Sequence, residues 1–315
     1  MKENISIFSG SSNPQLAEEI CRRLELPLGQ IKRSRFKSGE VYVHYEQGIR
    51  NQDVYLVQSF SHPINEQFVE LLVMIDAAKR ASAKTINLVV PYFGYARQER
   101  KGAPREPISA KMVSDVLTKT GADRLLTLDL HSAAIQGFFN IPVDHLSALD
   151  LISNHIKSLE LSNPIIVSPD AGRAETAEKL ASYLDYPFAF MVKKRAAHNE
   201  SSITHVIGEV EGHTPIIIED MIDTGMTVEN VATALEERGA RGAYVCATHA
   251  VFSSKALERL SHPNIRQVVV TDSIALPESS PPHIKVLSVA GLLAEAIRAN
   301  RRGGSISGLF KIKSV

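Results

Sequence analysis

The chain is poor in cysteine and carries no excess of charge, and each shortage excludes a class of protein. Only Cys21 and Cys246 occur among its 315 residues, far apart and without CxxC spacing. This argues against a disulfide framework or a zinc site and favours a reducing cytosol. The 35 basic residues balance 35 acidic ones, so we expect neither a nucleic-acid binder nor an acidic disordered tail.

Long apolar runs are also missing. No stretch approaches the ~20 apolar residues that span a bilayer. The opening residues, MKENISIFSG, lack the apolar run of a signal peptide. We therefore expect a soluble, cytoplasmic protein without a membrane partner.

Short apolar runs alternate with helical patterns along almost the whole chain. Several runs, such as INLVV and PIIIE, are apolar throughout, which is typical of parallel strands covered on both faces. The pattern predicts an α/β fold, and the length suggests about two domains, with the boundary around 144–150. The predicted strands are Ile5–Ser9, Val54–Ser59, Thr85–Pro91, Leu125–Leu130, Ile165–Ser168, Pro215–Glu219, Ala243–His249 and Val268–Asp272.

The most informative stretch is IIIEDMIDTGMT, residues 216–227. An apolar strand leads to Glu219 and Asp220 and then, through the loop 223–227, to a helix. Backbone N–H groups and two hydroxyls at a helix N-terminus form a cradle for a phosphate dianion, and the two acids could hold ribose hydroxyls or a hydrated magnesium ion. The alternative is an ordinary strand–turn–helix junction with solvated acids. A Walker A loop is excluded, because the Gly-Lys-Ser/Thr is missing.

Two further pairs of polar residues lie at or just after predicted strands. Asp129 and His131 are two apart, so on a regular strand both side chains point to one face and could ligate a divalent metal. A buried histidine bonded to a neighbouring carboxylate is the alternative. Lys193 and Arg195 are two cations that could neutralise negative charge on a bound group, or they could belong to a surface patch.

Together with other motifs, these stretches resemble class I ribose-phosphate diphosphokinases, the phosphoribosyl diphosphate synthases. The resemblance covers nearly the whole chain. It implies two similar phosphoribosyltransferase-type domains, 1–146 and 147–303, each a mainly parallel sheet flanked by helices, with a tail, 304–315, that packs on the first. The motifs are PYFGYARQ (91–98), LDLHS (128–132), IQGFF (135–139), IPVD (141–144), SPDAG (168–172), IKVLSVAGLLAEAI (284–297) and SISGLF (305–310).

The resemblance also implies the activity: Mg²⁺-ATP and ribose 5-phosphate give 5-phosphoribosyl 1-diphosphate and AMP. Lys193 and Arg195 are then catalytic, and Phe36 stacks on the adenine while Glu40 reaches ATP from a neighbouring subunit of a homohexamer built from dimers. The implied residues are, for ATP, Phe36, Ser38, Glu40, Arg97 and Gln98; for the metal, Asp129, His131 and Asp170; for ribose 5-phosphate, Arg195, Glu219, Asp220, Asp223, Thr224, Gly225, Met226 and Thr227; and for phosphate or ADP as effectors, Arg50, Ser82, Ser305, Ser307 and Phe310.

The sequence also departs from the family pattern. Ser38 replaces an aspartate, Arg173 follows Gly172 where a second glycine is usual, Met226 replaces a glycine and Glu219 replaces the first of two aspartates. Two alternatives therefore stay open: a catalytically impaired regulatory relative that binds an active synthase, or a phosphoribosyltransferase. The YARQER and DLHS motifs and the two-domain length count against the second.

Overall fold

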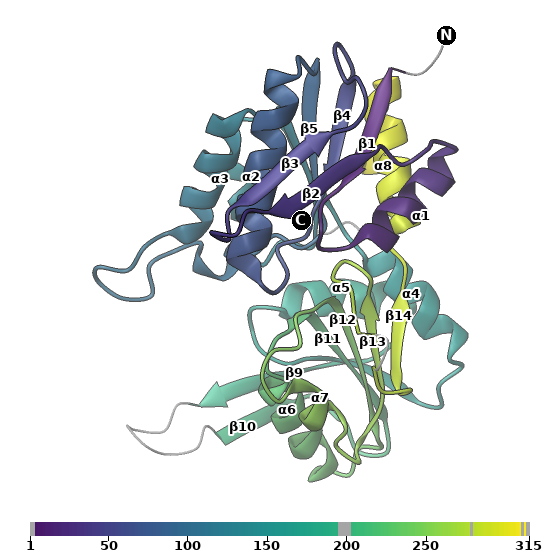
Figure 1. Cartoon of the computed structure of the whole chain (residues 1–315). Coiled ribbons are helices and arrows are strands. Elements are labelled where there is room, and N and C mark those ends of the chain that lie inside the picture. The colour runs from purple at the N-terminus through teal and green to yellow at the C-terminus, as the bar shows by residue number, and fades with distance from the viewer. Residues whose placement is uncertain (1–3, 195–202, 278–279, 310–311, 313–315) are drawn as a thin grey trace.

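Two separate sheets organise the computed structural model, which describes residues 4–194, 203–277, 280–309 and 312. They form two lobes, one above the other in Figure 1. The first sheet is wholly parallel, and its strands run in the order β1 (Ile5–Ser9), β4 (Asp53–Val57), β5 (Thr85–Val90), β6 (Arg124–Leu128) and β7 (Val143–Leu146).

The second sheet is parallel except at one edge, where β10 runs antiparallel to β9. The predicted α/β fold with parallel sheets is confirmed, and all the predicted strands are present with ends displaced by a few residues. The order is β10 (Ile203–Ile207), β9 (Phe188–Lys194), β8 (Pro164–Ser168), β11 (Thr214–Ile222), β12 (Ala243–Ala250), β13 (Ile265–Thr271) and β14 (Ile284–Leu287).

Helices cover these sheets because the strands are apolar on both faces: β5 and β8 are buried except at their first residue. No helix in the described part of the chain combines the length and apolarity needed to traverse a bilayer. The helices are α1 (Pro14–Leu24), α2 (Ile64–Arg80), α3 (Ser109–Thr120), α4 (Leu149–Ser158), α5 (Ala174–Leu184), α6 (Met226–Glu236), α7 (Ala256–Leu260) and α8 (Ala290–Arg302), with short 3₁₀ turns at η1 (Ala96–Gln98), η2 (Ala133–Phe138) and η3 (Ser307–Leu309).

The last helix returns to the first lobe. Figure 1 shows α8 beside α1, and Arg298 Nη2 donates to Arg23 O at 2.9 Å while Asn300 Nδ2 donates to Asp144 Oδ2 at 3.0 Å. The expected ranges 1–146, 147–303 and 304–315 remain a prediction, but α8 lies in space with the first sheet although it falls within 147–303.

A buried polar seam joins the two lobes. The fully buried His249, at the end of β12, contacts Leu128 O and Asp129 O of the first lobe through Nε2, at 3.1 and 3.3 Å. Its neighbour Thr248 donates through Oγ1 to Asp129 Oδ2 at 2.6 Å. The carboxyl ends of β6 and β12 are thereby held against one another, and the candidate site lies beside this contact.

Candidate active site

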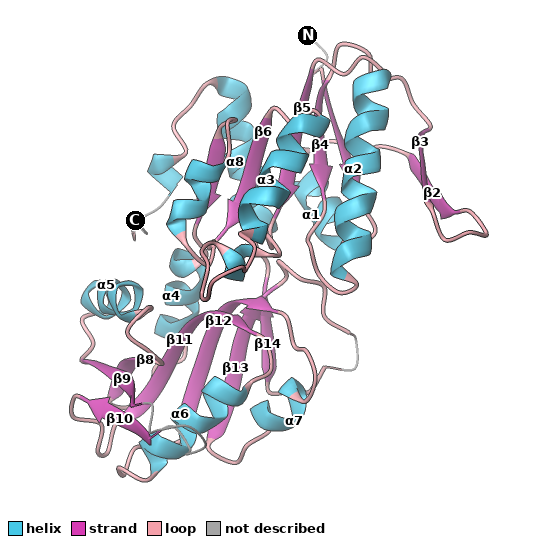
Figure 2. Cartoon of the chain, turned by 90° about the vertical axis from the view of Figure 1, so that its left-hand side faces the viewer, coloured by secondary structure: helices cyan, strands magenta, loops and turns pink. Residues whose placement is uncertain are grey.

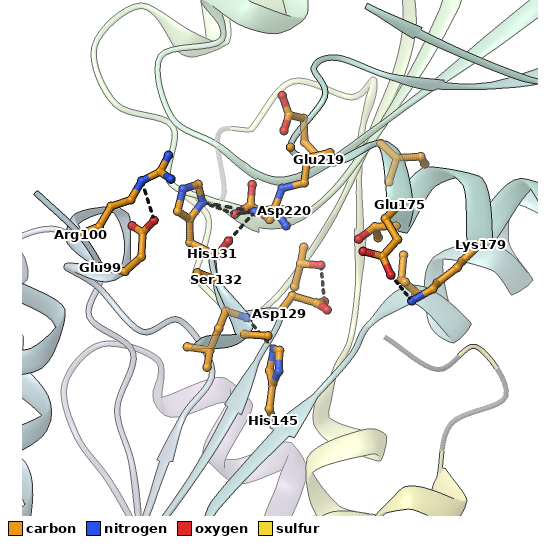
Figure 3. Close-up of a pocket in the computed structure, with 18 residues that line it drawn as sticks. Glu99, Arg100, Asp129, His131, Ser132, His145, Glu175, Lys179, Glu219 and Asp220 are labelled. Atoms are coloured by element: carbon orange, nitrogen blue, oxygen red, sulfur yellow. Dashed lines mark hydrogen bonds and ion pairs between the residues drawn. The ribbon is translucent and has the colours of Figure 1, made fainter. Parts of the chain in front are cut away.

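A cavity of about 390 Å³ opens between the lobes. Figure 3 shows side chains from both lobes facing it. The position fits the rule that open α/β sheets bind ligands beyond the carboxyl ends of their strands. Up to the end of β7, the lining residues are Glu99, Arg100, Asp129, Leu130, His131, Ser132, Ala133 and His145. After β7, they are Leu149, Gly172, Arg173, Glu175, Thr176, Lys179, Ile218, Glu219, Asp220 and Thr248.

The central contact of the cavity joins His131 to Asp220. His131 Nδ1 lies 2.8 Å from Asp220 Oδ2, and Figure 3 shows the two side chains pointing toward each other. An ionised carboxylate only accepts hydrogen bonds, so Nδ1 carries the hydrogen that faces Asp220, and the tautomer that this selects has its lone pair on Nε2. A carboxylate that fixes one ring nitrogen in this way is the usual partner of a metal-binding or base-acting histidine.

A guanidinium completes this cluster. Arg173 pairs with Asp220, and its Nη2 lies 3.2 Å from His131 Nδ1 and 3.4 Å from His131 O. Burial opposes ionisation of Asp220, but the hydrogen bond from His131 and the nearby positive charge of Arg173 hold the pKa of this carboxyl below its usual value. Asp220 is therefore ionised at neutral pH, as the hydrogen-bond assignment requires.

Asp129 lies where the backbone leaves the strand. We expected a regular strand to place Asp129 and His131 on one face, but β6 ends at Leu128 and Asp129 has a φ of 32°. Its Oδ2 accepts from Ala148 N at 2.9 Å and from Thr248 Oγ1. Asp129 and His131 do line one cavity, but a turn, and not strand alternation, brings them there.

Asp170 is held by its own loop. Its Oδ1 accepts from Gly172 N at 2.9 Å and from Arg173 N at 3.2 Å. The three predicted metal residues thus make no joint cluster, and no group of three or more His, Cys, Asp or Glu side chains among the described residues is arranged to hold a metal. Mg²⁺ typically uses one or two carboxylates, several waters and substrate phosphates. The cavity is lined by the carboxylates of Asp129, Glu219 and Asp220. One or two of these are enough to hold a magnesium ion that keeps most of its water ligands.

The predicted phosphate loop follows β11. The strand continues two residues past Asp220 to Ile222, and Gly225, with a φ of 76°, caps α6. A Cβ at Gly225 would lie 3.3 Å from Ala256 O, so both the conformation and the space favour glycine. Met226, which replaces the usual glycine, is half exposed and leaves this turn intact.

Asp223 links the phosphate loop to the first lobe. It pairs with Arg97 and accepts a hydrogen bond from Ser253. Burial again opposes ionisation, but these two donors hold the pKa of Asp223 below its usual value. Arg97, predicted to bind ATP, is therefore in contact with Asp223, predicted to bind ribose 5-phosphate. Gln98, the other ATP residue predicted in this segment, accepts a hydrogen bond from Ser109 Oγ at 2.5 Å.

The other predicted ATP residues lie at the tip of the antiparallel hairpin of β2 (Ile31–Arg35) and β3 (Val41–Tyr45). This hairpin projects from the first lobe (Figure 2). Phe36 is 56% exposed and packs edge-on against Tyr42. Ser38 donates to Glu40 Oε2 at 2.5 Å. None of the three lines the cavity of this chain, so their role in binding ATP remains a prediction that requires a second copy.

The catalytic and effector predictions fall largely on undescribed positions. Lys193 lies within β9 but its side chain is not described, and Arg195 lies outside the described residues. Of the effector residues, Ser82 accepts through its carbonyl from Asn51 N, next to Arg50. The side chain of Ser307 and all of Phe310 lie outside the described part, and Ser305 is exposed.

Sequence reasoning missed several polar residues that line the cavity, Thr248 and His145 among them, and the role of Arg173. Thr248 holds Asp129, and His145 accepts through Nε2 from Leu130 N at 2.9 Å. Burial lowers the pKa of His145. His145 could have been recognised from its position directly after the IPVD motif. Arg173 could have been recognised because it departs from the family pattern.

Comparison with known proteins identifies the family. Residues 5–121 match the family model for the N-terminal domain of ribose phosphate pyrophosphokinase, and residues 174–311 match that for the phosphoribosyl synthetase-associated domain. The ribose-phosphate pyrophosphokinase of Fusobacterium nucleatum is 48% identical over 310 residues, which are 98% of each chain. The chain belongs to the ribose-phosphate pyrophosphokinase family. The Bacillus subtilis member is 47% identical over 309 residues.

A solved structure of the family has the same fold. The crystal structure of phosphoribosylpyrophosphate synthetase from Mycobacterium smegmatis superposes with a TM-score of 0.91 at 40% identity. The match covers 96% of this chain and 100% of that one. The arrangement of both lobes is therefore that of a ribose-phosphate pyrophosphokinase.

Proposed function

We propose that the chain transfers the diphosphoryl group of Mg²⁺-ATP to the anomeric hydroxyl of ribose 5-phosphate, giving 5-phosphoribosyl 1-diphosphate and AMP. One observation carries this proposal. The His131 loop, the Glu219–Asp220 pair and the start of α5 converge on one cavity between the lobes, in a chain 48% identical over nearly its full length to a named pyrophosphokinase.

Ribose 5-phosphate is assigned to the phosphate loop. Its phosphate would accept from the backbone N–H groups and hydroxyls of residues 223–227 at the start of α6, where the helix dipole favours a dianion. Glu219 and Asp220, which precede this loop on β11, would accept from the ribose hydroxyls. The sugar would then present its anomeric hydroxyl to the cavity.

ATP is assigned to Arg97 and Gln98 together with the β2–β3 hairpin of a neighbouring copy. Phe36 is exposed and available for stacking on a planar base. Since this hairpin projects away from the lobe that bears it, we propose a homo-oligomer, dimers assembled into a hexamer, in which it completes the nucleotide site. Phosphate and ADP are proposed effectors at the site of Arg50, Ser82 and the tail. The cytoplasm is the proposed compartment.

Magnesium is assigned to the cavity, with His131 Nε2 and the carboxylate of Asp129 as the lining residues that would hold it, directly or through water. Asp170, which lies in the loop just before α5 and does not line the cavity, stays a predicted ligand that would act through water. When bound, the ion would neutralise charge on the ATP phosphates. The chain's own residues position the reactants. His131 is oriented by Asp220, and Lys193 and Arg195 would stabilise negative charge on the diphosphoryl group as the anomeric oxygen attacks the β-phosphorus.

The deciding experiment identifies the nucleotide product. The full-length chain is incubated with ATP, magnesium and ribose 5-phosphate, and we expect AMP together with 5-phosphoribosyl 1-diphosphate. ADP would mean transfer of the γ-phosphate and would overturn the mechanism. No turnover, with tight binding to an active synthase, would favour a regulatory relative. Consumption of 5-phosphoribosyl 1-diphosphate in the presence of a purine base would favour a phosphoribosyltransferase.

A further inference from the structure

Arg173 places a cation of the chain itself at the centre of the cavity. It immediately precedes α5, and its side chain is 18% exposed while that of its partner Asp220 is 6% exposed. The guanidinium also lies beside the ring and the carbonyl of His131, which belongs to the other lobe. A nearly buried ion pair of this kind is screened little by solvent.

Both donors act on the same oxygen. Asp220 Oδ2 is the atom that faces His131 Nδ1 and the atom that faces Arg173 Nη2. A magnesium ion binds carboxylate oxygens at about 2.1 Å. A divalent cation on Oδ2 would therefore occupy the position of the guanidinium, and one bound nearby would meet its positive charge at short range.

We propose that Arg173 is an internal competitor of the divalent cation in this cavity. The guanidinium occupies Asp220 Oδ2 and contacts His131 O while no metal is bound, and it must withdraw from Asp220 when a divalent cation binds there. Arg173 is thus a positioning residue that raises the metal concentration at which the cavity becomes half occupied. This inference rests on the proposed function only in placing a divalent cation in this cavity. It adds Asp220 Oδ2, which the proposed function gives to the ribose hydroxyls, as an oxygen that the cation contacts while no sugar is bound.

Another cation lining the same cavity provides a matched control. Lys179, on α5, pairs with Glu175 at 2.9 Å, and Figure 3 shows this pair away from Asp220. The Lys179 and Glu175 side chains are 35% and 71% exposed, so solvent screens their charges. Neutralising Lys179 changes the net charge of the cavity as much as neutralising Arg173 does, but it leaves Asp220 untouched.

The test measures metal binding without nucleotide or sugar. Mn²⁺ is titrated into the full-length chain and free Mn²⁺ is followed by electron paramagnetic resonance. Arg173→Gln should lower the Mn²⁺ dissociation constant by ~10-fold or more. Arg173→Lys, which keeps the charge, should lower it less, and Lys179→Gln should change it by no more than about twofold. An unchanged or weaker affinity in Arg173→Gln, or an equal gain in Lys179→Gln, would overturn the proposal.

A second measurement uses the unaltered protein, in case Arg173→Gln does not fold. Phenylglyoxal modification of Arg173, followed by mass spectrometry, should become faster when Mn²⁺ is added, because the guanidinium leaves Asp220. An unchanged rate at saturating Mn²⁺, or no Mn²⁺ binding at all, would overturn the proposal.

These outcomes are separate from those of the activity test. AMP formation with unchanged metal affinity in Arg173→Gln would refute the role of Arg173 alone. Tighter metal binding in a chain that forms no AMP would refute the proposed function alone.

Discussion

Replacing Thr248 by valine tests whether the polar seam holds the lobes together. The Thr248 hydroxyl donates to Asp129 Oδ2 at 2.6 Å, and Thr248 is 2% exposed. Valine has nearly the same shape but no donor. A hydrogen bond to a charged group contributes ~1.5–3 kcal/mol, and leaving a buried acceptor unsatisfied costs a similar amount. Asp129 keeps its bond from Ala148 N, so we expect Thr248→Val to lower the free energy of unfolding by about 2 kcal/mol.

Urea denaturation at neutral pH measures this loss. Thr118→Val is the matched control, because the Thr118 hydroxyl donates only to Ser114 O within α3; its loss should stay below ~0.5 kcal/mol, since that carbonyl already serves the helix. If both variants lose the same amount, or if Thr248→Val loses less than about 0.5 kcal/mol, the hydroxyl does not hold the lobes and the reasoning on the seam fails.

The remaining predictions concern pH and catalysis. Burial lowers the pKa of His145 and of His249, so both stay neutral in the folded chain and take up protons on unfolding; stability should therefore fall as pH drops below ~6.5, and urea midpoints equal at pH 7.5 and 5.5 would contradict this. His131→Ala should raise the magnesium concentration for half-maximal activity while the circular dichroism spectrum stays unchanged, and an unaltered magnesium dependence would remove His131 from the site. Lys193→Ala should lower kcat by roughly a hundred- to a thousand-fold, since one preorganised charge contact is worth ~2.7–4 kcal/mol, with ribose 5-phosphate binding less affected; a fall below tenfold would count against its role. Arg195→Ala should in addition weaken ribose 5-phosphate binding, measured by calorimetry, because a guanidinium also holds phosphate oxygens in the ground state.

The sequence by itself determined the strands that carry the site. β5 and β8 are largely apolar, and β11 has the apolar run PIII before its two acids; only a sheet covered on both faces can bury such runs, so composition and length sufficed to predict these strands. The phosphate loop was also readable, because Gly225 supplies the positive φ needed between β11 and α6. These are local properties, decided by residues close together in the chain.

The short and polar strands were not readable. β2 is IKRSR and alternates between half-buried and exposed residues, and β7 and β14 each have four residues. Their apolar content is too small to distinguish them from loops. Pairing with a neighbouring strand makes each of them a strand: β2 pairs with β3, β7 with β6 and β14 with β13.

The chemistry of the cavity was decided only by the tertiary structure. Asp220 lies 89 residues from His131, and Arg173 lies 42 residues from it. No spacing rule relates positions so far apart, because their meeting depends on how two separate sheets pack. That packing also turns Asp129 out of its strand and onto Thr248. Most of the acids and His131 were predicted from the sequence. That His131 is hydrogen-bonded to Asp220, and that Arg173 forms an ion pair with the same carboxylate, follows only from the contact between the lobes.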